Sequence, residues 1–365
     1  MDMEKIYPRR MILINGNFLC RNLTGIERFA WEICKRLDKL AAGEDISILV
    51  PKNAKATPEF ENIKTIWSEK EIHGFPKWDL LDFRKACRKL NATGLNFSNT
   101  APLGKNCGYA FIHDIYARDF PEDFTSKKEI LIKIYSRLNY WNIAKNAKKV
   151  LTVSNFSKNR IQKAYGVDES RIEVIPNGYD HFKTTEEDER IFERFPELKE
   201  KQFYFTLGSL QKRKNLKWIA EHASKHPDER FAISGKVISG LESNEISELK
   251  RMANVTLLGY VSDGEVKALM KKCRAFVFPS YYEGFGIPPL EALSVGAKII
   301  VAKAASLPEI YGNAAGYIDP ENADCDLDDI LGKIDGSEAE KVLSEYTYQN
   351  SAEKLANVLF KNPLC

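Results

Sequence analysis

The stretch that decides the fold is residues 274–316, RAFVFPSYYEGFGIPPLEALSVGAKIIVAKAASLPEIYGNAAG. Its apolar run at residues 275–278 predicts a short strand buried in a parallel sheet. The loop at residues 281–286 contains two glycines, which allow the backbone to approach a ligand closely. A short helix with Pro289 in its first turn follows, and a second apolar run at residues 297–302 completes a strand–loop–helix–strand unit. The helix N-terminus of such a unit lies at the carboxyl edge of the sheet, where it attracts phosphate.

Two acidic residues flank this expected anion site. Glu291 falls near the third helical position if Pro289 is the first, and an acid there stabilises the helix dipole by about 1 kcal/mol or less. Glu283 lies in the glycine loop, where a carboxylate would repel phosphate but could accept hydrogen bonds from hydroxyl groups. An anion site beside hydroxyl-binding carboxylates suits a nucleotide sugar.

Composition places the chain among globular proteins with more than one domain. It has 365 residues, 44% hydrophobic and 29% charged, which suits two domains of ordinary size. No apolar run is long enough to span a membrane, and the N-terminus lacks the pattern of a signal peptide, so a cytoplasmic location is expected. The seven cysteines form no CxxC pair, which favours reduced thiols. The five histidines include no HExxH motif, and we interpret them as unpaired. Neither a metal nor another cofactor is therefore expected.

The charge is distributed unevenly. Residues 1–180 contain 30 Lys and Arg against 22 Asp and Glu, whereas the remaining residues contain 24 against 29. A basic first half suggests an acidic partner such as anionic lipid or a lipid-linked phosphate, although solubility alone also explains it. Nothing points to a nucleic acid, and the oligomeric state stays open.

Alternating strands and helices in both halves predict an α/β fold of two doubly wound domains that face each other across a cleft. The expected strands are residues 11–14, 46–50, 65–67, 111–112, 150–153 and 172–175, then 203–207, 231–234, 255–258, 275–278 and 297–302. The predicted organisation is a first domain at residues 1–182, a charged linker at 183–200, a second domain at 201–345 and a final helix within 346–365 that packs back on the first domain.

Residues 127–149 form a basic helical stretch with Tyr135, Tyr140 and Trp141 interspersed. A helix that lies on a membrane surface has this composition. An ordinary helix with one face on the sheet and its lysines in water has it too, and that interpretation is favoured because such helices are common.

Two further features lie at strand ends. The basic residues 212–214 follow a strand and precede a helix, at the same sheet edge as the glycine loop. Cations there could neutralise a diphosphate and stabilise it as a leaving group. His113 also follows a strand. A lone histidine is more often a core or surface residue than a catalytic one, and the strand-end position of His113 raises the catalytic interpretation only to even odds.

The ordered set of motifs resembles the retaining glycosyltransferases of the GT-B fold that carry a Glu-x7-Glu signature. The signature corresponds to residues 283–291, EGFGIPPLE, and the resemblance extends through Gly296 and residues 306–309. The other matching segments are residues 24–28, 113–114, 153–154 and 174–178, together with Gly208 and residues 213–215. They cover nearly the whole chain in the right order, and their style is similar to that of bacterial mannosyltransferases.

The resemblance implies roles for particular residues. Glu283 would contact the donor sugar hydroxyls and Glu291 the ribose, while Lys214 and Arg213 would hold the diphosphate. The catalytic set would be Glu283, His113, Lys214 and Arg213. The donor-binding set would be Glu291, Gly284, Phe285, Gly286, Ile287, Leu290, Gly208, Ser209, Gly235, Tyr260, Val261 and Gly25, with the base near Gly235, Tyr260 and Val261. The family needs no metal.

Two positions depart from the family pattern. Many relatives have Arg where this chain has Ser209, so Arg213 is expected to supply the charge. Tyr348 stands where relatives often have Trp, which should affect packing rather than chemistry.

The implied reaction is transfer of a hexose from a nucleoside-diphosphate sugar, with GDP-mannose expected before UDP-hexose or dTDP-rhamnose, and with retention at the anomeric carbon. The acceptor would be a glycan or a lipid-linked saccharide in the synthesis of cell-surface polysaccharide such as capsule or lipopolysaccharide. Peripheral contact with the inner face of the membrane would accompany it. The alternatives are a nucleotide-sugar epimerase or phosphorylase of the same fold, and a non-catalytic sugar-nucleotide binding protein.

Overall fold

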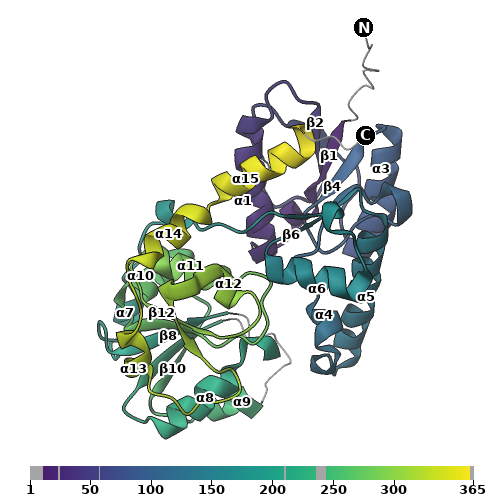
Figure 1. The fold of residues 1–365 in the computed structure, drawn as a ribbon. Coiled ribbons are helices and arrows are strands. Elements are labelled where there is room, and N and C mark those ends of the chain that lie inside the picture. The colour runs from purple at the N-terminus through teal and green to yellow at the C-terminus, as the bar shows by residue number, and fades with distance from the viewer. Residues whose placement is uncertain (1–10, 24, 57, 209–210, 236–243, 362–365) are drawn as a thin grey trace. The chain divides into compact units, whose positions relative to one another are not determined.

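The chain folds into two α/β units, each built on one parallel sheet (Figure 1). The computed structural model describes residues 11–23, 25–56, 58–208, 211–235 and 244–361. Unit 1 comprises Met1–Asn177 with Tyr348–Cys365, and unit 2 comprises Gly178–Thr347. This is the alternating architecture that the apolar runs predict.

Unit 1 has a seven-stranded sheet in the order β3-β2-β1-β4-β5-β6-β7. Its strands are β1 Ile12–Asn15, β2 Ile46–Val50, β3 Lys64–Trp67, β4 Thr93–Asn96, β5 Tyr109–Phe111, β6 Lys149–Thr152 and β7 Ile172–Val174. Its longer helices are α1 Gly25–Leu40, α3 Phe83–Lys89, α5 Lys127–Asn146, α6 Asn155–Tyr165 and α15 Tyr348–Ala356. The strand order reverses between β1 and β4, and ligands of doubly wound sheets bind outside the carboxyl ends of strands at such a point.

Alternation along the strands of unit 1 places successive side chains on opposite faces of the sheet. Ile14 and Leu151 belong to the cluster that contains Phe29 of α1 and Leu355 of α15. Val150, on the other face, belongs to a second cluster that contains buried residues of α5 and α6. Helices α1 and α15 therefore cover one face, and α5 and α6 cover the other.

Unit 2 has a six-stranded sheet in the order β10-β9-β8-β11-β12-β13. Its strands are β8 Phe203–Leu207, β9 Arg230–Ser234, β10 Val255–Gly259, β11 Ala275–Phe278, β12 Ile299–Ala302 and β13 Ala315–Ile318. Its helices are α7 Ile191–Arg194, α8 Leu216–Lys225, α9 Asn244–Leu249, α10 Asp263–Lys272, α11 Ile287–Ser294, α12 Leu307–Tyr311, α13 Leu327–Gly332 and α14 Glu338–Glu345. The strand order reverses between β8 and β11, so by the same rule a ligand would bind at the loops that follow these two strands.

The charged segment 183–200 belongs to unit 2, which corrects the expectation of a linker. Lys267 Nζ donates a hydrogen bond to the carbonyl of Thr185 at 2.7 Å, and the Asp188 amide donates to the carbonyl of Gly264 at 3.1 Å. These bonds attach the segment to α10 because its backbone groups need partners that the short helix α7 does not supply.

Helix α15 lies in unit 1, as part of the same cluster as α1. Tyr348 is fully buried, with its ring 6.2 Å from that of Phe29. Ser351 Oγ donates a hydrogen bond to the carbonyl of Pro176 at 2.7 Å. Tyrosine at the position where relatives often have Trp thus fills a core site.

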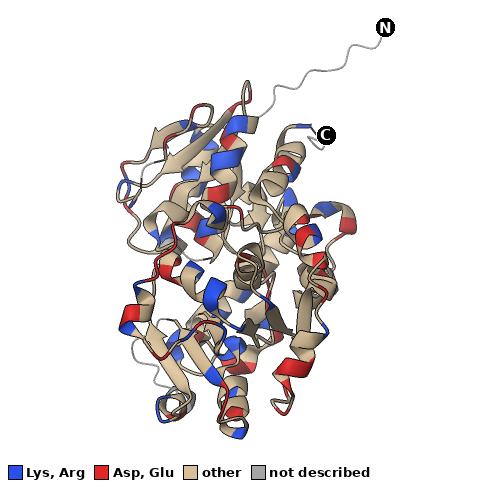
Figure 2. Cartoon of the chain, turned by 90° about the vertical axis from the view of Figure 1, so that its left-hand side faces the viewer, with Lys and Arg blue, Asp and Glu red and all other residues tan. Residues whose placement is uncertain are grey.

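Basic and acidic residues are interspersed on the face that Figure 2 presents. Of the helices in the described ranges, none is both long and apolar enough to cross a bilayer.

Candidate functional site

The glycine loop of unit 2 is held rigidly between β11 and α11. Ser306 Oγ hydrogen bonds to the carbonyls of Glu283 and Phe285 at 3.0 and 3.1 Å. Tyr311 donates its hydroxyl to the carbonyl of Gly286, which has a φ of 91°. A Cβ at Gly286 would lie 2.7 Å from Leu307, so both the backbone angle and the space require glycine.

Helix α11 begins at Ile287, two residues before Pro289, so the first-turn position expected of Glu291 is wrong. Its expected contact with the ribose stays a prediction. Glu291 lies beyond the first turn, where an acid gains little from the dipole. Its Oε1 lies 3.0 Å from Nε2 of His181, and both side chains are buried. Glu291 therefore lies beside a histidine from the start of unit 2.

Prolines limit the anion site at the start of α11. Pro288 and Pro289 have no N–H group, and the N–H of Leu290, the fourth helical residue, is the one that normally bonds within the helix to the N-cap carbonyl. Among the first four helical residues, Ile287 is thus the one whose N–H could face a phosphate. Leu290, expected among the donor-binding residues, is a buried residue of this helix, and its role stays a prediction. Cationic side chains must therefore supply most of the attraction for a diphosphate.

Two basic residues, Arg213 and Lys214, lie beside the glycine loop. The turn Lys212–Lys214 follows β8, and Asn215, in the left-handed conformation, ends it. The Asn215 side chain donates hydrogen bonds to the carbonyls of Pro279 and Pro320 at 3.2 and 2.8 Å. The Tyr281 amide donates to the carbonyl of Arg213 at 3.0 Å. These bonds hold the basic turn against the end of β11.

Glu283 lies between the two cations. Its Oε1 is 2.6 Å from Lys214 Nζ, and its Oε2 is 2.9 Å from Arg213 Nη1. The carboxylate is buried. Burial alone would raise the pKa of Glu283, but the charges of Arg213 and Lys214 outweigh it and hold that pKa below its usual value. Glu283 is therefore ionised, and the three side chains together carry one positive charge.

The base-binding residues predicted from the sequence lie along the same edge. The amide of Gly208 donates to the carbonyl of Ser234 at 3.1 Å, and that of Gly235 donates to the carbonyl of Gly259 at 3.1 Å. The ends of β8, β9 and β10 therefore lie side by side. Tyr260 is exposed and Val261 is buried. Ser209 lies outside the described residues.

A small cavity adjoins this edge. It is lined by Thr206, Leu207, Gly208, Lys214, Leu216, Ile233, Ser234, Phe278, Pro279 and Ser280. A Cβ at Gly208 would meet the aliphatic part of the Lys214 side chain at 3.4 Å. Glycine thus leaves room for the lysine, whose Nζ lies 4.8 Å from the centre of the Phe278 ring.

His113 follows β5 in unit 1 and is buried among aromatic rings. Its Nε2 lies 2.7 Å from the carbonyl of Phe97, and its ring stacks on Phe111 at 5.4 Å. Burial lowers the pKa of His113, so the ring is neutral near pH 7, with Nε2 as the donor and Nδ1 as the acceptor. Gly25 is the first residue of α1. The catalytic role of His113 stays a prediction.

Asp79 is a buried group of unit 1 that the sequence did not reveal. Its carboxylate accepts hydrogen bonds from Asn15 at 3.0 Å, Asn17 at 2.9 Å and Thr100 at 2.7 Å. Burial raises the pKa of Asp79 despite these hydrogen bonds. Asn17 and Tyr135 also have buried polar atoms without a hydrogen-bond partner. Since Asn15 ends β1, the group lies at the carboxyl edge, where such atoms could bind sugar hydroxyls.

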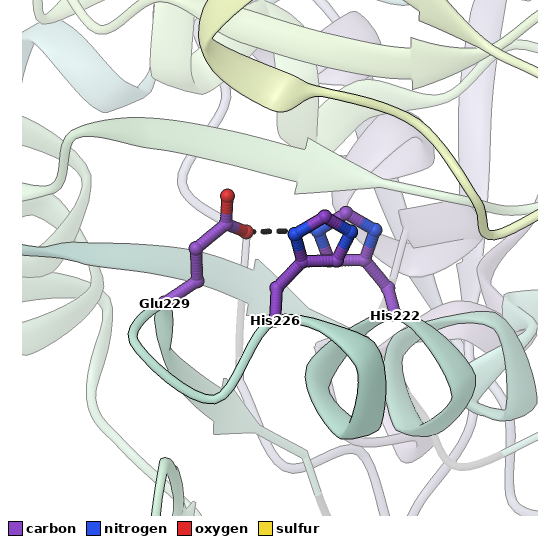
Figure 3. A group of neighbouring side chains, drawn as sticks. All are labelled: His222, His226 and Glu229. Carbon is purple, nitrogen blue, oxygen red and sulfur yellow. Dashed lines mark hydrogen bonds and ion pairs between the residues drawn. The ribbon is translucent and has the colours of Figure 1, made fainter.

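A histidine pair lies near the C-terminal end of α8 (Figure 3). Contrary to expectation, His222 and His226 are one helical turn apart, and with Glu229 they form a compact group. The two rings are stacked 4.3 Å apart at an angle of 14°. A metal ion binds imidazole in the plane of the ring, so nearly parallel rings do not share one ion in this arrangement.

The group instead forms a buried ion pair. His222 Nε2 lies 2.8 Å from Glu229 Oε2, and Nδ1 lies 2.9 Å from the carbonyl of Ala323. Burial alone would lower the pKa of His222, but hydrogen bonds with Cys325, Glu229 and Ala323 raise it to about 9. His222 is therefore charged at neutral pH.

His222 should make the stability of unit 2 depend on pH. Because its folded pKa exceeds its unfolded value, the stabilisation is complete below the unfolded pKa and is lost as the pH rises through about 9. The loss should be on the order of 2 kcal/mol. Urea unfolding between about pH 7 and about pH 10 measures it. His222→Gln should flatten this dependence, whereas His73→Gln, at an exposed histidine, should not. If the free energy of unfolding changed equally with pH in the wild type and in His222→Gln, the charged state assigned to His222 would be wrong.

Comparison with known proteins agrees with the fold. Residues 187–350 match the family described as Glycosyl transferases group 1, and residues 23–182 match Glycosyltransferase Family 4. The sucrose-phosphate synthase structure from Thermosynechococcus elongatus superposes with a TM-score of 0.70 at 14% identity, covering 97% of this chain and 99% of that one. Two parallel-sheet units and this structural likeness fit a GT-B fold. Residues 187–350 thus belong to the group 1 glycosyltransferases, and the second family matches most of the first half of the chain.

Two curated relatives are named as glycosyltransferases. The O-antigen chain mannosyltransferase RfbU of Salmonella typhimurium is 31% identical over 228 residues, which are 61% of this chain and 60% of that protein. A UDP-Gal:alpha-D-GlcNAc-diphosphoundecaprenol alpha-1,3-galactosyltransferase of Escherichia coli is 30% identical over 203 residues, 52% of this chain and 51% of that protein. The matches thus span between half and two thirds of these relatives.

Proposed function

We propose that this protein transfers a hexose from a nucleoside-diphosphate sugar to an acceptor hydroxyl, with retention at the anomeric carbon. The observation that carries the proposal is the contact of Glu283 with both Lys214 and Arg213 beside the glycine loop. The two cations suit the diphosphate of the donor, and the carboxylate suits its sugar hydroxyls. Glu291 and the edge formed by Gly208, Gly235 and Tyr260 would bind the nucleoside.

The state of Glu283 favours front-face attack over a double displacement. Both of its oxygens are bound by cations, and its pKa is lowered, so it is a weak base and a poor nucleophile. The departing phosphate would then accept the acceptor proton. Arg213 and Lys214 would stabilise the negative charge that develops on it, and the rigid loop would hold the donor in place.

The donor and acceptor are proposed by analogy with the relatives. GDP-mannose comes first because RfbU is described as a mannosyltransferase, whereas the galactosyltransferase keeps UDP-hexose in consideration. The acceptor would be a glycan or a lipid-linked saccharide of cell-surface polysaccharide. A screen of nucleotide sugars by saturation-transfer NMR tests this. Binding by none of GDP-mannose, UDP-hexoses and dTDP-rhamnose would contradict the proposal.

Two other functions make different predictions. A nucleotide-sugar epimerase would convert the donor without an acceptor, which NMR of enzyme and donor alone would detect. A non-catalytic binding protein would hold the donor without consuming it in the presence of acceptor. The buried contacts of Glu283 with two cations favour the transferase, since a binding protein has no need to stabilise a leaving group.

The transferase should need no metal ion, because Arg213 and Lys214 supply the charge that a divalent cation would otherwise bring to the diphosphate. Dialysis against EDTA should leave the initial rate unchanged. Untreated enzyme assayed in parallel is the control. A loss of rate that only a divalent ion restores would show that these side chains do not suffice.

A further inference from the structure

We infer that α5 is a membrane-docking helix that binds the surface of an anionic bilayer. Its C-terminal part is anchored in the core of unit 1, with Tyr140, Ile143 and Ala144 buried against the sheet. In contrast, none of residues 127–138, all of which the structure describes, is buried. The expectation of an ordinary helix with one face on the sheet therefore holds only for the last turns. The N-terminal turns are free to meet another surface.

The exposed side chains of α5 form a continuous apolar stripe. Leu131, Ile134, Leu138 and Trp141 are 68%, 50%, 59% and 52% exposed. Their spacing of three, four and three residues places them on one side of the helix. Soluble surfaces seldom leave four large apolar residues contiguous, so this stripe marks a site of interaction.

Basic residues surround the stripe. Lys127 and Lys145 extend it by one turn at each end, and α5 has five basic residues, Lys127, Lys128, Lys133, Arg137 and Lys145, against the single acid Glu129. Apolar side chains with a tryptophan, bordered by lysine and arginine, fit the boundary between acyl chains and anionic headgroups. The Lys145 ammonium lies 5.0 Å from the Trp141 ring, next to where headgroups would lie.

The same charges disfavour a second copy of the chain as the occupant. Spacings of three and four residues also occur in coiled coils, where the flanking positions of partner helices carry opposite charges. Two copies of α5 would instead bring Lys127, Arg137 and Lys145 of each helix towards those of the other. An anionic membrane neutralises these charges.

A capping box stabilises the N-terminal end of α5. Ser126 Oγ accepts a hydrogen bond from the Glu129 amide at 3.2 Å, and Glu129 Oε2 accepts one from the Ser126 amide at 2.8 Å. This capping box fixes the start of α5. The stripe is therefore preformed and would lose little conformational entropy on binding.

Cosedimentation with vesicles tests the inference. The full chain should bind vesicles of phosphatidylcholine with phosphatidylglycerol, and binding should fall with added salt and with phosphatidylcholine alone. Leu131→Glu and Trp141→Glu should each weaken binding by about tenfold. Trp67→Glu, at an exposed tryptophan of the edge strand β3, changes the charge equally and should bind as the wild type does.

Other outcomes would overturn the inference. Equal binding by Trp141→Glu and Trp67→Glu, or no binding by the wild type, would exclude α5 as the docking surface. A wild-type dimer in sedimentation velocity that Leu131→Glu dissociates would assign the stripe to self-association. Thermal melting should be unchanged in all variants, since these side chains are exposed. The inference does not depend on the proposed function, because vesicle binding is measured without donor or acceptor.

Discussion

Replacing Glu283 by glutamine should lower kcat/KM by about 10²–10³-fold, the size of effect expected when one preorganised electrostatic group is removed from an active site. Glutamine keeps the shape and one acceptor oxygen but removes the charge. Lys214 and Arg213 would lose the anion that holds them at 2.6 and 2.9 Å. Both cations and the donor sugar would then be less well positioned. Initial rates at varied donor concentration measure the effect.

Stability separates loss of chemistry from loss of fold. Because the pKa of Glu283 is lowered in the folded protein, its stabilising contribution is present above its unfolded pKa and is lost as the pH falls through the folded value. The Glu283→Gln variant should therefore be less stable than the wild type near neutral pH, and the difference should shrink in acid. A folded variant with normal turnover would rule out the catalytic role of Glu283. A stability difference independent of pH would rule out the ionised state.

Strands could be predicted from the sequence where they are purely apolar, but not where packing requires a glycine. Strands β4 and β13 were not predicted because Gly94 and Gly316 interrupt their patterns. In the structure a Cβ at Gly94 would lie 3.0 Å from Phe83, and one at Gly316 would lie 2.4 Å from Ile330. In each case a helix approaches the strand so closely that only glycine fits. The distance between a strand and the helix packed on it cannot be derived from the spacing of residues in the sequence.

The site was predictable to the extent that strand order brings it together. The loops that carry Lys214 and Glu283 follow β8 and β11, which are neighbours in the sheet, and parallel strands place such loops at one edge. His181 and Asp79 were missed because their partners are distant in sequence and follow no motif. His181 pairs with Glu291 and Asp79 with Asn15. The start of α11 was misjudged because two prolines follow Ile287, and either could have been the first helical residue.

Replacing Lys214 by methionine should have the second largest effect, a loss of about 10²–10³-fold in kcat/KM. Methionine retains the apolar stem that lies against Gly208 and removes only the charge that faces the diphosphate. The affinity for the free nucleoside diphosphate should fall as well, since that product carries the same phosphates. Initial rates and isothermal titration calorimetry with the nucleoside diphosphate measure the two effects.

Lys212→Met is the matched control for this prediction. Lys212 belongs to the same turn and carries the same charge, but its side chain is exposed, so its loss should change kcat/KM by no more than about threefold. If both variants lost activity equally, the general positive potential of the turn would be responsible. If Lys214→Met alone lost activity while product affinity stayed the same, Lys214 would act on the developing charge rather than on ground-state binding. If neither variant lost activity, the basic turn would not be part of the catalytic site.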